Sequence, residues 1–155
     1  MAPRLLQTHW QVPARIEEVS DILDDAEALP RWWGEVYLAA DIIAPGGPDG
    51  IGRRVKFHTR GWLPYTLRWV AELVAVDRPH SWTIRASGDL IGQGIWHLTQ
   101  QGPVADIHYA WRVEVGKPLL RPVTPLLWPA FAANHRWAMA KGLAGLRREL
   151  ARRRA

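Results

Sequence analysis

The chain has 155 residues, with 20 Lys and Arg against 15 Asp and Glu, no Cys, and 48% apolar residues. This length favours a single domain over residues 1–155, whose core buries roughly two-thirds of the surface of the unfolded chain. Without cysteine there is no disulfide framework, thiol catalysis or cysteine-ligated zinc site. No apolar run reaches the ~18 residues of a membrane span, and the first residues lack a signal-peptide pattern, so we expect a cytoplasmic protein.

Positive charge is concentrated at the end of the chain, within its last fifteen residues. Such a cluster suits nucleic acid or an anionic membrane surface, but it also complements the negative end of a terminal helix and keeps that helix soluble. No nucleic-acid-binding motif accompanies it, so we favour the helical role and expect no nucleic-acid partner. The cations are Lys141, Arg147, Arg148, Arg152, Arg153 and Arg154.

Periodicity and turn residues predict the elements in chain order. Residues 5–12 alternate as in a strand, and residues 14–23 place apolar side chains at helical spacing. A second, short helix is expected from Asp25 to about Arg31. The period then changes to two, and strands are predicted at 35–43, 52–60, 64–76, 80–87, 92–100 and 104–115. Short loops of Gly, Pro and Asp separate most of these strands, which indicates an antiparallel meander.

The last third of the chain reads as one long helix from Thr124 to about Arg153, with Thr124 as its cap and Pro125 in its first turn. Pro129 implies that the helix kinks or begins there. Its apolar stripe is Trp128, Phe131, Ala132, His135, Met139, Leu143, Leu146 and Leu150. The order is therefore β-α-α-β6-α, an α+β fold in which about seven antiparallel strands curve around a long C-terminal helix.

The alternation also predicts which face of the sheet is buried. The apolar phase contains Trp10, Trp69, Trp82, Trp96 and Trp111, and the opposite phase contains charged and His side chains, among them His97, Asp106 and His108. If Gly102-Pro103 is a two-residue turn, opposite positions sum to 205. The facing pairs are then Trp96 with Tyr109, Leu98 with Ile107, Gly94 with Trp111, and His97 with His108.

Two features favour a cavity over a core filled by indoles. Trp and Tyr each carry a polar atom that needs a partner, which makes them awkward core residues. Gly88, Gly92 and Gly94 lie close together in predicted strands, where they suggest bends or bulges that curve the sheet away from the helix. A curved sheet with a spanning helix can enclose an apolar pocket that has a few polar points.

Several stretches resemble the START-like (SRPBCC) helix-grip superfamily, in particular its polyketide cyclase/dehydrase and lipid transport branch. They are PARIEEVSDILDD, LPRWWGEV, GWLPYTLRW, GDLIGQGIWHL, YAWRV and NHRWAMAKGLAGL, and they extend over nearly the whole chain. The resemblance implies a hydrophobic ligand between the concave sheet and the C-terminal helix, and it carries no catalytic signature onto these positions. The residues expected to line the pocket are Trp33, Phe57, Tyr65, Trp69, Trp82, Trp96, Tyr109, Trp111, Phe131, Asn134, His135 and Met139.

Few residues offer chemistry beyond binding, because the short hydrolase, metalloprotease, P-loop and dinucleotide motifs are absent. His135 is the best general acid or base, Tyr109 is a candidate proton donor or ligand anchor, and both also suit a core. Glu35 and Asp89 are acids or solvated loop charges. His97 and His108 can bind a transition metal adventitiously, but a functional site needs a third protein ligand, so we expect no metal and no cofactor.

These observations leave three functions open. The first is binding of a hydrophobic small molecule or lipid, aromatic or polycyclic, by a monomer or homodimer. The second is a polyketide cyclase/aromatase or dehydratase-type enzyme that uses the same pocket. The third is a ligand-free interaction or stress-response module whose indoles fill the concave face. A pocket of roughly 300 Å³ or more would argue against the third.

Overall fold

A computed structural model describes residues 4–116 and 121–155. Strand β1 (Arg4–Pro13) precedes helix α1 (Ile16–Asp24), the 3-10 turn η1 (Ala26–Ala28) and the short helix α2 (Leu29–Trp32). The strands that follow are β2 (Tyr37–Ala44), β3 (Arg54–Arg60), β4 (Thr66–Asp77), β5 (Ser81–Gly88), β6 (Leu90–Gln101) and β7 (Val104–Val115). A 3-10 turn, η2 (Arg121–Val123), then leads into the long helix α3 (Thr124–Arg154).

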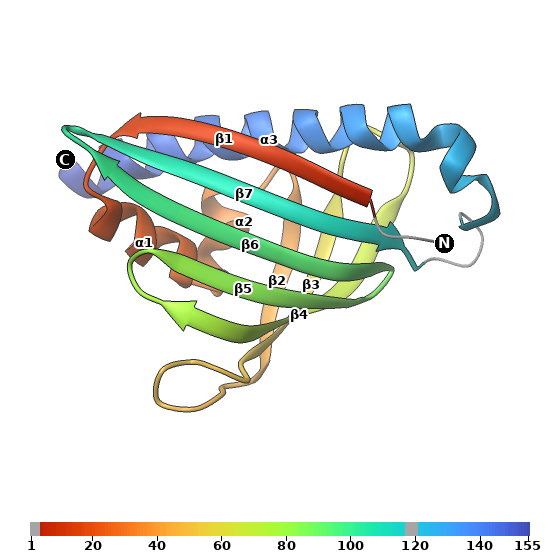
Figure 1. The fold of residues 1–155 in the computed structure, drawn as a ribbon, viewed down its shortest axis with the longest axis horizontal. Coiled ribbons are helices and arrows are strands. Elements are labelled where there is room, and N and C mark those ends of the chain that lie inside the picture. Colours follow the sequence, from red (N-terminus) through yellow and green to blue (C-terminus); the bar gives the residue numbers. More distant parts are fainter. Residues whose placement is uncertain (1–3, 117–120) are drawn as a thin grey trace.

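The strands form one seven-stranded antiparallel sheet in the order β1-β7-β6-β5-β4-β3-β2 (Figure 1). Strands β2 to β7 pair with their neighbours in sequence, whereas β1 pairs with β7 and forms one edge of the sheet. The predicted register between β6 and β7 is confirmed, since Trp96 lies opposite Tyr109 and Gly94 lies opposite Trp111. The Gly102-Pro103 turn sets this register, and Gly102 has the positive φ (58°) that the first position of such a turn requires.

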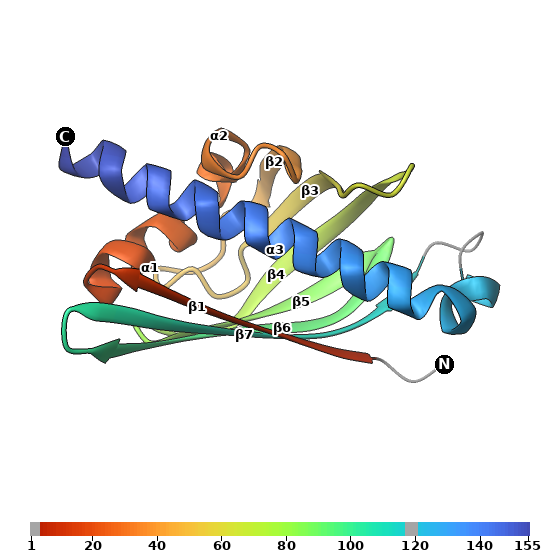
Figure 2. The same cartoon turned by 90° about the horizontal axis from the view of Figure 1, so that it is seen from above.

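The sheet is curved, and α3 crosses its concave side (Figure 2). Helix α1 buries Ile16, Val19 and Ile22, the predicted apolar face, at the same end of the sheet as the C-terminal half of α3. It begins where the Glu18 carboxylate accepts a hydrogen bond from the backbone N–H of Arg15 (3.0 Å). This curved sheet with a long covering helix is the helix-grip α+β fold that the sequence predicts. No helix in the described residues is both long and apolar enough to cross a bilayer.

The ends of the strands agree with the predicted ends within two residues. Two other local expectations are corrected. Helix α3 begins at Thr124 with Val123 as its N-cap, so Pro129 lies inside the helix and Thr124 is not the cap. No bulge occurs at Gly92 or Gly94, because the register of β6 with both neighbours is unbroken. A Cβ at Gly92 would lie 2.0 Å from the Arg112 carbonyl oxygen. The glycine there permits close strand approach instead of a bulge.

Glycines also let α3 approach the segment around α2. A Cβ at Gly145 would lie 2.0 Å from the carbonyl oxygen of Trp32, and a Cβ at Gly142 would lie 2.5 Å from the indole of Trp33. The same indole donates a hydrogen bond from its Nε1 to the carbonyl oxygen of Ala138 (2.9 Å). Helix α3 is therefore held against the Trp32-Trp33 turn by contacts that leave no room for side chains at these glycines.

The cationic C-terminal end of α3 surrounds one buried carboxylate. The Glu149 side chain is only 3% exposed and forms ion pairs with Arg31 of α2 (2.9 Å), with Arg152 (2.9 Å) and with Arg153 (3.0 Å). Hydrogen bonds from these arginines, chiefly Arg152, lower the pKa of Glu149 to about 2. The clustered charge thus has an intramolecular role, since part of it links α3 to α2.

We expect the substitution Glu149→Gln to destabilise the protein by about 1.5–3 kcal/mol, the range for hydrogen bonds to charged groups. The new amide presents N–H donors to arginine donors in a buried position. Urea unfolding at pH 7 measures the change. Glu17→Gln is the matched control, because Glu17 pairs with Arg15 at 3.5 Å with both side chains more than half exposed. That change should cost about 0.5 kcal/mol or less. An equal loss of stability in the two variants would show that Glu149 does not link α3 to α2.

Candidate functional site

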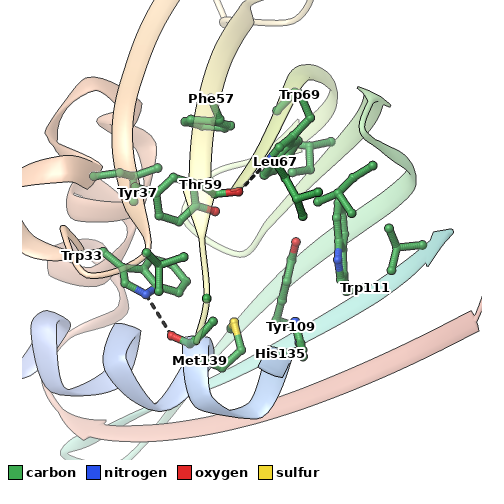
Figure 3. Close-up of a pocket in the computed structure, with 18 of the residues that line it drawn as sticks. Trp33, Tyr37, Phe57, Thr59, Leu67, Trp69, Tyr109, Trp111, His135 and Met139 are labelled. Atoms are coloured by element: carbon green, nitrogen blue, oxygen red, sulfur yellow. Dashed lines mark hydrogen bonds between the residues drawn. The ribbon is translucent and has the colours of Figure 1, made fainter. Parts of the chain in front are cut away.

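A cavity of about 220 Å³ lies between the concave face of the sheet and α3 (Figure 3). Side chains from each of the strands, from both shorter helices and from α3 border it. The structure places every residue predicted to line a pocket on its wall: Trp33, Phe57, Tyr65, Trp69, Trp82, Trp96, Tyr109, Trp111, Phe131, Asn134, His135 and Met139. The strand phase and the apolar stripe of α3 account for most of these residues, whereas Trp33, Tyr65 and Asn134 were expected there only from the family resemblance.

Aromatic rings form a continuous wall on the sheet side of the cavity. Tyr109 stacks on Trp96 at 4.2 Å between ring centroids and lies beside Trp111 at 5.8 Å. Trp111 in turn contacts Trp69 at 5.8 Å. A Cβ at Gly94 would lie 2.7 Å from the Tyr109 hydroxyl and 2.8 Å from the Trp111 ring. The glycine opposite Trp111 thus makes room for both rings.

Three of the lining indoles have their N–H groups bound within the protein. Trp69 Nε1 donates to Thr59 Oγ1 (3.1 Å), and Trp33 Nε1 donates to the Ala138 carbonyl (2.9 Å). Trp82 Nε1 donates to Asp24 Oδ1 (3.2 Å). These bonds fix the ring orientations and leave the apolar ring surfaces to face the cavity.

Apart from Arg53 and Arg60, the titratable groups that line the cavity are neutral near pH 7. Burial lowers the pKa of His135 to about 4, and its Nε2 lies 3.4 Å from Thr8 Oγ1. Burial also raises the pKa of Tyr109 well above its usual value and that of Tyr65 to about 12. No Asp, Glu, Ser or Lys lines the cavity among the described residues. The site therefore offers hydrogen bonds from an imidazole and phenols without a carboxylate to attract a cationic ligand.

Asn134 has a structural role that sequence reasoning missed. Its Oδ1 accepts hydrogen bonds from the backbone N–H groups of Trp62 (2.9 Å) and Leu63 (3.4 Å), which lie in the loop between β3 and β4. In the same region Tyr65 packs edge-on against Phe131 of α3, with 6.2 Å between ring centroids. Asn134 and this aromatic pair hold the loop against the helix at one end of the cavity.

Two other candidates lie away from the cavity. Glu35 is exposed and pairs with Lys141 at 3.2 Å. Asp89 accepts a hydrogen bond from the backbone N–H of Arg68 (2.9 Å), across the strand ends. Neither carboxylate borders the cavity, which argues against a role for either as an acid that acts there.

Sequence reasoning also omitted several lining residues. Leu67, Ala71 and Leu73 share the inner phase of β4 with Trp69, so the signal for them was present in the alternation. Leu23, Ala26 and Leu29 also line the cavity and come from α1, η1 and α2. Tyr37 and Arg53 reach it from the start of β2 and from the residue before β3. The Arg53 guanidinium pairs with Asp24 (3.2 Å), a carboxylate that it shares with Arg78 (3.0 Å).

The outer face of the sheet corrects one prediction. Asp106 lies in the expected polar phase, yet it is only 8% exposed. His9 Nε2 contacts one carboxylate oxygen at 2.6 Å, His108 Nε2 contacts the other at 2.8 Å, and Gln11 Nε2 donates to the first at 3.0 Å. These hydrogen bonds, chiefly the one from His9, lower the pKa of Asp106 to about 2. Strand β1 therefore covers a carboxylate that the sequence alone places in solvent.

Protein stability is expected to fall as the pH falls from about 6.5 to about 4. The pKa of His135 is 6.5 when unperturbed and about 4 in the folded protein, so in this window the unfolded chain binds the proton more tightly. The loss is at most about 3.5 kcal/mol, from about 1.4 kcal/mol per pKa unit. Urea midpoints at pH 7.5, 5.5 and 4.5 measure it. In the variant His135→Gln, the loss of stability with falling pH should be smaller. An equal loss in the two proteins would show that His135 is not the group responsible.

Comparison with known proteins places this architecture in a group. A family model for polyketide cyclase / dehydrase and lipid transport matches residues 5–151. A Thermus thermophilus structure superposes with a TM-score of 0.74 at 17% identity, over 92% of this chain and 97% of that one. A START superfamily protein from Mycobacterium smegmatis gives 0.69 at 17% identity, over 92% and 98%. The Zhui aromatase/cyclase from a Streptomyces species gives 0.72 at 13% identity, over 99% and 96%.

No curated protein matches the chain. At identities this low, the solved structures show a shared fold alone. The family model extends over nearly the whole sequence, and it agrees with the resemblance that the motifs predicted. The chain has the START-like helix-grip fold and belongs to the polyketide cyclase / dehydrase and lipid transport family.

Proposed function

We propose that the protein binds a small aromatic molecule in the cavity between the sheet and α3. The observation that carries this proposal is the continuous ring wall from Trp96 through Tyr109 to Trp111 and Trp69. Flat indole and phenol faces complement a flat aromatic ligand and supply large contact area with little loss of conformational entropy. The family assignment supports the same general role, since its description includes lipid transport.

The size of the cavity limits the ligand. An engineered protein cavity of about 150 Å³ holds benzene, and this cavity measures about 220 Å³. By that comparison the site accommodates one or two fused rings, and a larger polycyclic ligand or an acyl chain requires it to widen. The volume is also below the roughly 300 Å³ of a typical ligand site. The ligand-free alternative is therefore decided by a binding measurement and not by volume.

An acid–base enzyme is the second candidate, supported by the name of the aromatase/cyclase neighbour and by His135 and Tyr109 on the cavity wall. The electrostatics favour binding over this alternative. A general base works best with a pKa near the working pH, and burial lowers the pKa of His135 to about 4. The substitution His135→Gln separates the two roles. It should leave binding nearly intact, whereas an acid–base enzyme would lose about a hundredfold or more in rate.

Binding is tested by native mass spectrometry of the purified protein and by Trp fluorescence titration. The titration series contains 2-naphthol, a naphthoquinone, a fatty acid and a four-ring aromatic. Trp62 is half exposed and lies outside the cavity lining, so the variant Trp62→Phe removes a solvent-facing indole that would report non-specific quenching. We expect saturable quenching by the two-ring compounds in both proteins. A protein that co-purifies with nothing and ignores the whole series would refute the proposal.

A further inference from the structure

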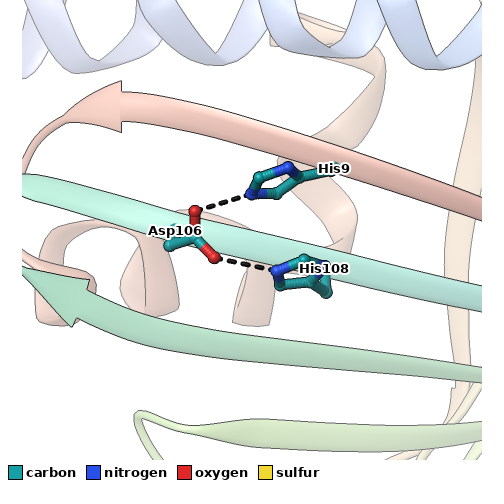
Figure 4. A group of neighbouring side chains, drawn as sticks. All are labelled: His9, Asp106 and His108. Carbon is teal, nitrogen blue, oxygen red and sulfur yellow. Dashed lines mark hydrogen bonds and ion pairs between the residues drawn. The ribbon is translucent and has the colours of Figure 1, made fainter.

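A cluster of three potential metal ligands lies on the outer face of the sheet, away from the cavity (Figure 4). His9 and His108 turn their Nε2 atoms toward the two oxygens of Asp106, at 2.6 and 2.8 Å. The two imidazoles are stacked, with 4.2 Å between centroids and 8° between ring planes. The three ligand atoms therefore converge on one small volume, and all lie within 4.8 Å of one another.

The backbone positions the cluster firmly. His9 of β1 and His108 of β7 are directly opposite in a pairing that runs without a break from Arg4 to Pro13. Asp106 is two residues before His108 on the same face of β7 and opposite Gln11, whose amide donates to its carboxylate at 3.0 Å. Partners of this kind orient a ligating carboxylate and strengthen metal sites. Three ligands on two paired strands lose little conformational entropy on binding an ion.

The donor set determines the class of ion. Two imidazole nitrogens and one carboxylate oxygen suit zinc and its first-row neighbours, whereas magnesium and calcium prefer oxygen ligands throughout. In a tetrahedral zinc site with bonds of about 2.0–2.1 Å, ligand atoms are about 3.3 Å apart. The two Nε2–oxygen pairs, at 2.6 and 2.8 Å, need to separate by less than about 1 Å to admit the ion. The His9 and His108 side chains are 48% and 55% exposed, so solvent can complete the coordination.

We propose that His9, Asp106 and His108 bind a divalent first-row transition ion, zinc in the first instance, and that the ion ties β1 to β7. Strand β1 is an edge of the sheet, and β7 is its only partner among the described strands. An ion that binds the folded protein but not the unfolded chain stabilises this pairing and raises the melting temperature. The site is on the opposite face of the sheet from the cavity, so it is independent of the proposed ligand-binding function.

The test is calorimetric titration of the untagged full chain with zinc chloride at pH 7.5. We expect one ion per chain with a dissociation constant in the micromolar range or below, and at least a tenfold weakening in each of His9→Gln, Asp106→Asn and His108→Gln. His97→Gln is the matched control, because His97 is also exposed and lies opposite His108 on the other neighbouring strand, β6. This variant should bind as the parent does.

Two further readouts protect the test from a folding artefact. Zinc should raise the melting temperature of the parent and of His97→Gln, and it should leave that of His108→Gln unchanged. In NMR spectra of the side chains, only the imidazoles of His9 and His108 should move on addition of the ion. Millimolar binding only, or an equal loss in His97→Gln, would overturn the proposal. Loss of binding in a variant whose spectrum is otherwise native would support it.

Discussion

Replacing Gly145 with alanine is expected to destabilise the protein by about 2 kcal/mol, although the same change in an exposed helix stabilises by up to about 1 kcal/mol. The new Cβ would lie 2.0 Å from the Trp32 carbonyl oxygen and 3.4 Å from the Trp32 ring. A backbone atom cannot swing away as a flexible side chain can, so α3 must shift from α2, at an overpacking cost of about 1–3 kcal/mol. Thermal unfolding should show a drop of about 4–8 °C.

The matched control is Ala144→Gly, one residue earlier on the exposed side of α3. It changes helix propensity in the opposite direction without touching α2 and should cost up to about 1 kcal/mol. If Gly145→Ala raised the melting temperature, α3 and the Trp32 carbonyl would not be in close contact. The result also bears on the site, because the same segment of α3 positions the cavity wall through the bond from Trp33 to Ala138.

Replacing Ala71 with phenylalanine is expected to weaken binding of a two-ring aromatic ligand by about a hundredfold or more while the fold is kept. Ala71 is 4% exposed and lines the cavity from β4. The change adds a phenyl group, and since benzene occupies a cavity of about 150 Å³, the group would take most of the 220 Å³ available. Filling an apolar void commonly stabilises a protein by about 0.5–2 kcal/mol.

Fluorescence titration and thermal unfolding of the same sample are both needed here. The control Val70→Phe adds the same ring on the neighbouring residue, which faces the outer side of β4 opposite Lys56 and Ser87. Its affinity should match the parent. Unchanged affinity in Ala71→Phe would show that the ligand binds elsewhere, and Ala71→Leu provides a smaller filling residue if the ring overpacks the site.

Local sequence patterns were sufficient to predict much of the inner surface of the cavity. The two-residue turn at Gly102-Pro103 fixed the pairing of Trp96 with Tyr109, because a hairpin register follows from its loop length. Period-two alternation then assigned the aromatic residues to one face, and all of the predicted lining residues border the cavity. The apolar stripe of α3 supplied the opposite wall, including His135 and Met139.

Contacts between residues far apart in the sequence could not be predicted from these local patterns. The pairing of β1 with β7 joins residues almost a hundred positions apart, and it alone brings His9 to Asp106 and buries that carboxylate. The sequence instead placed His108 beside His97, which is correct for the register of β6 with β7 but omits the other neighbouring strand. The contact of Asn134 with the loop between β3 and β4 was hidden for the same reason.

The sequence by itself determined the order of elements, the inner face of the sheet and the family, because periodicity, turn residues and short motifs are local and survive without coordinates. Only the tertiary structure decided the volume of the cavity, the neutral state of His135 and the cluster of His9, Asp106 and His108. Each of these depends on how closely distant segments approach. Burial and hydrogen bonding, which set pKa values and ligand geometry, arise only when the sheet closes against α3 and β1 pairs with β7.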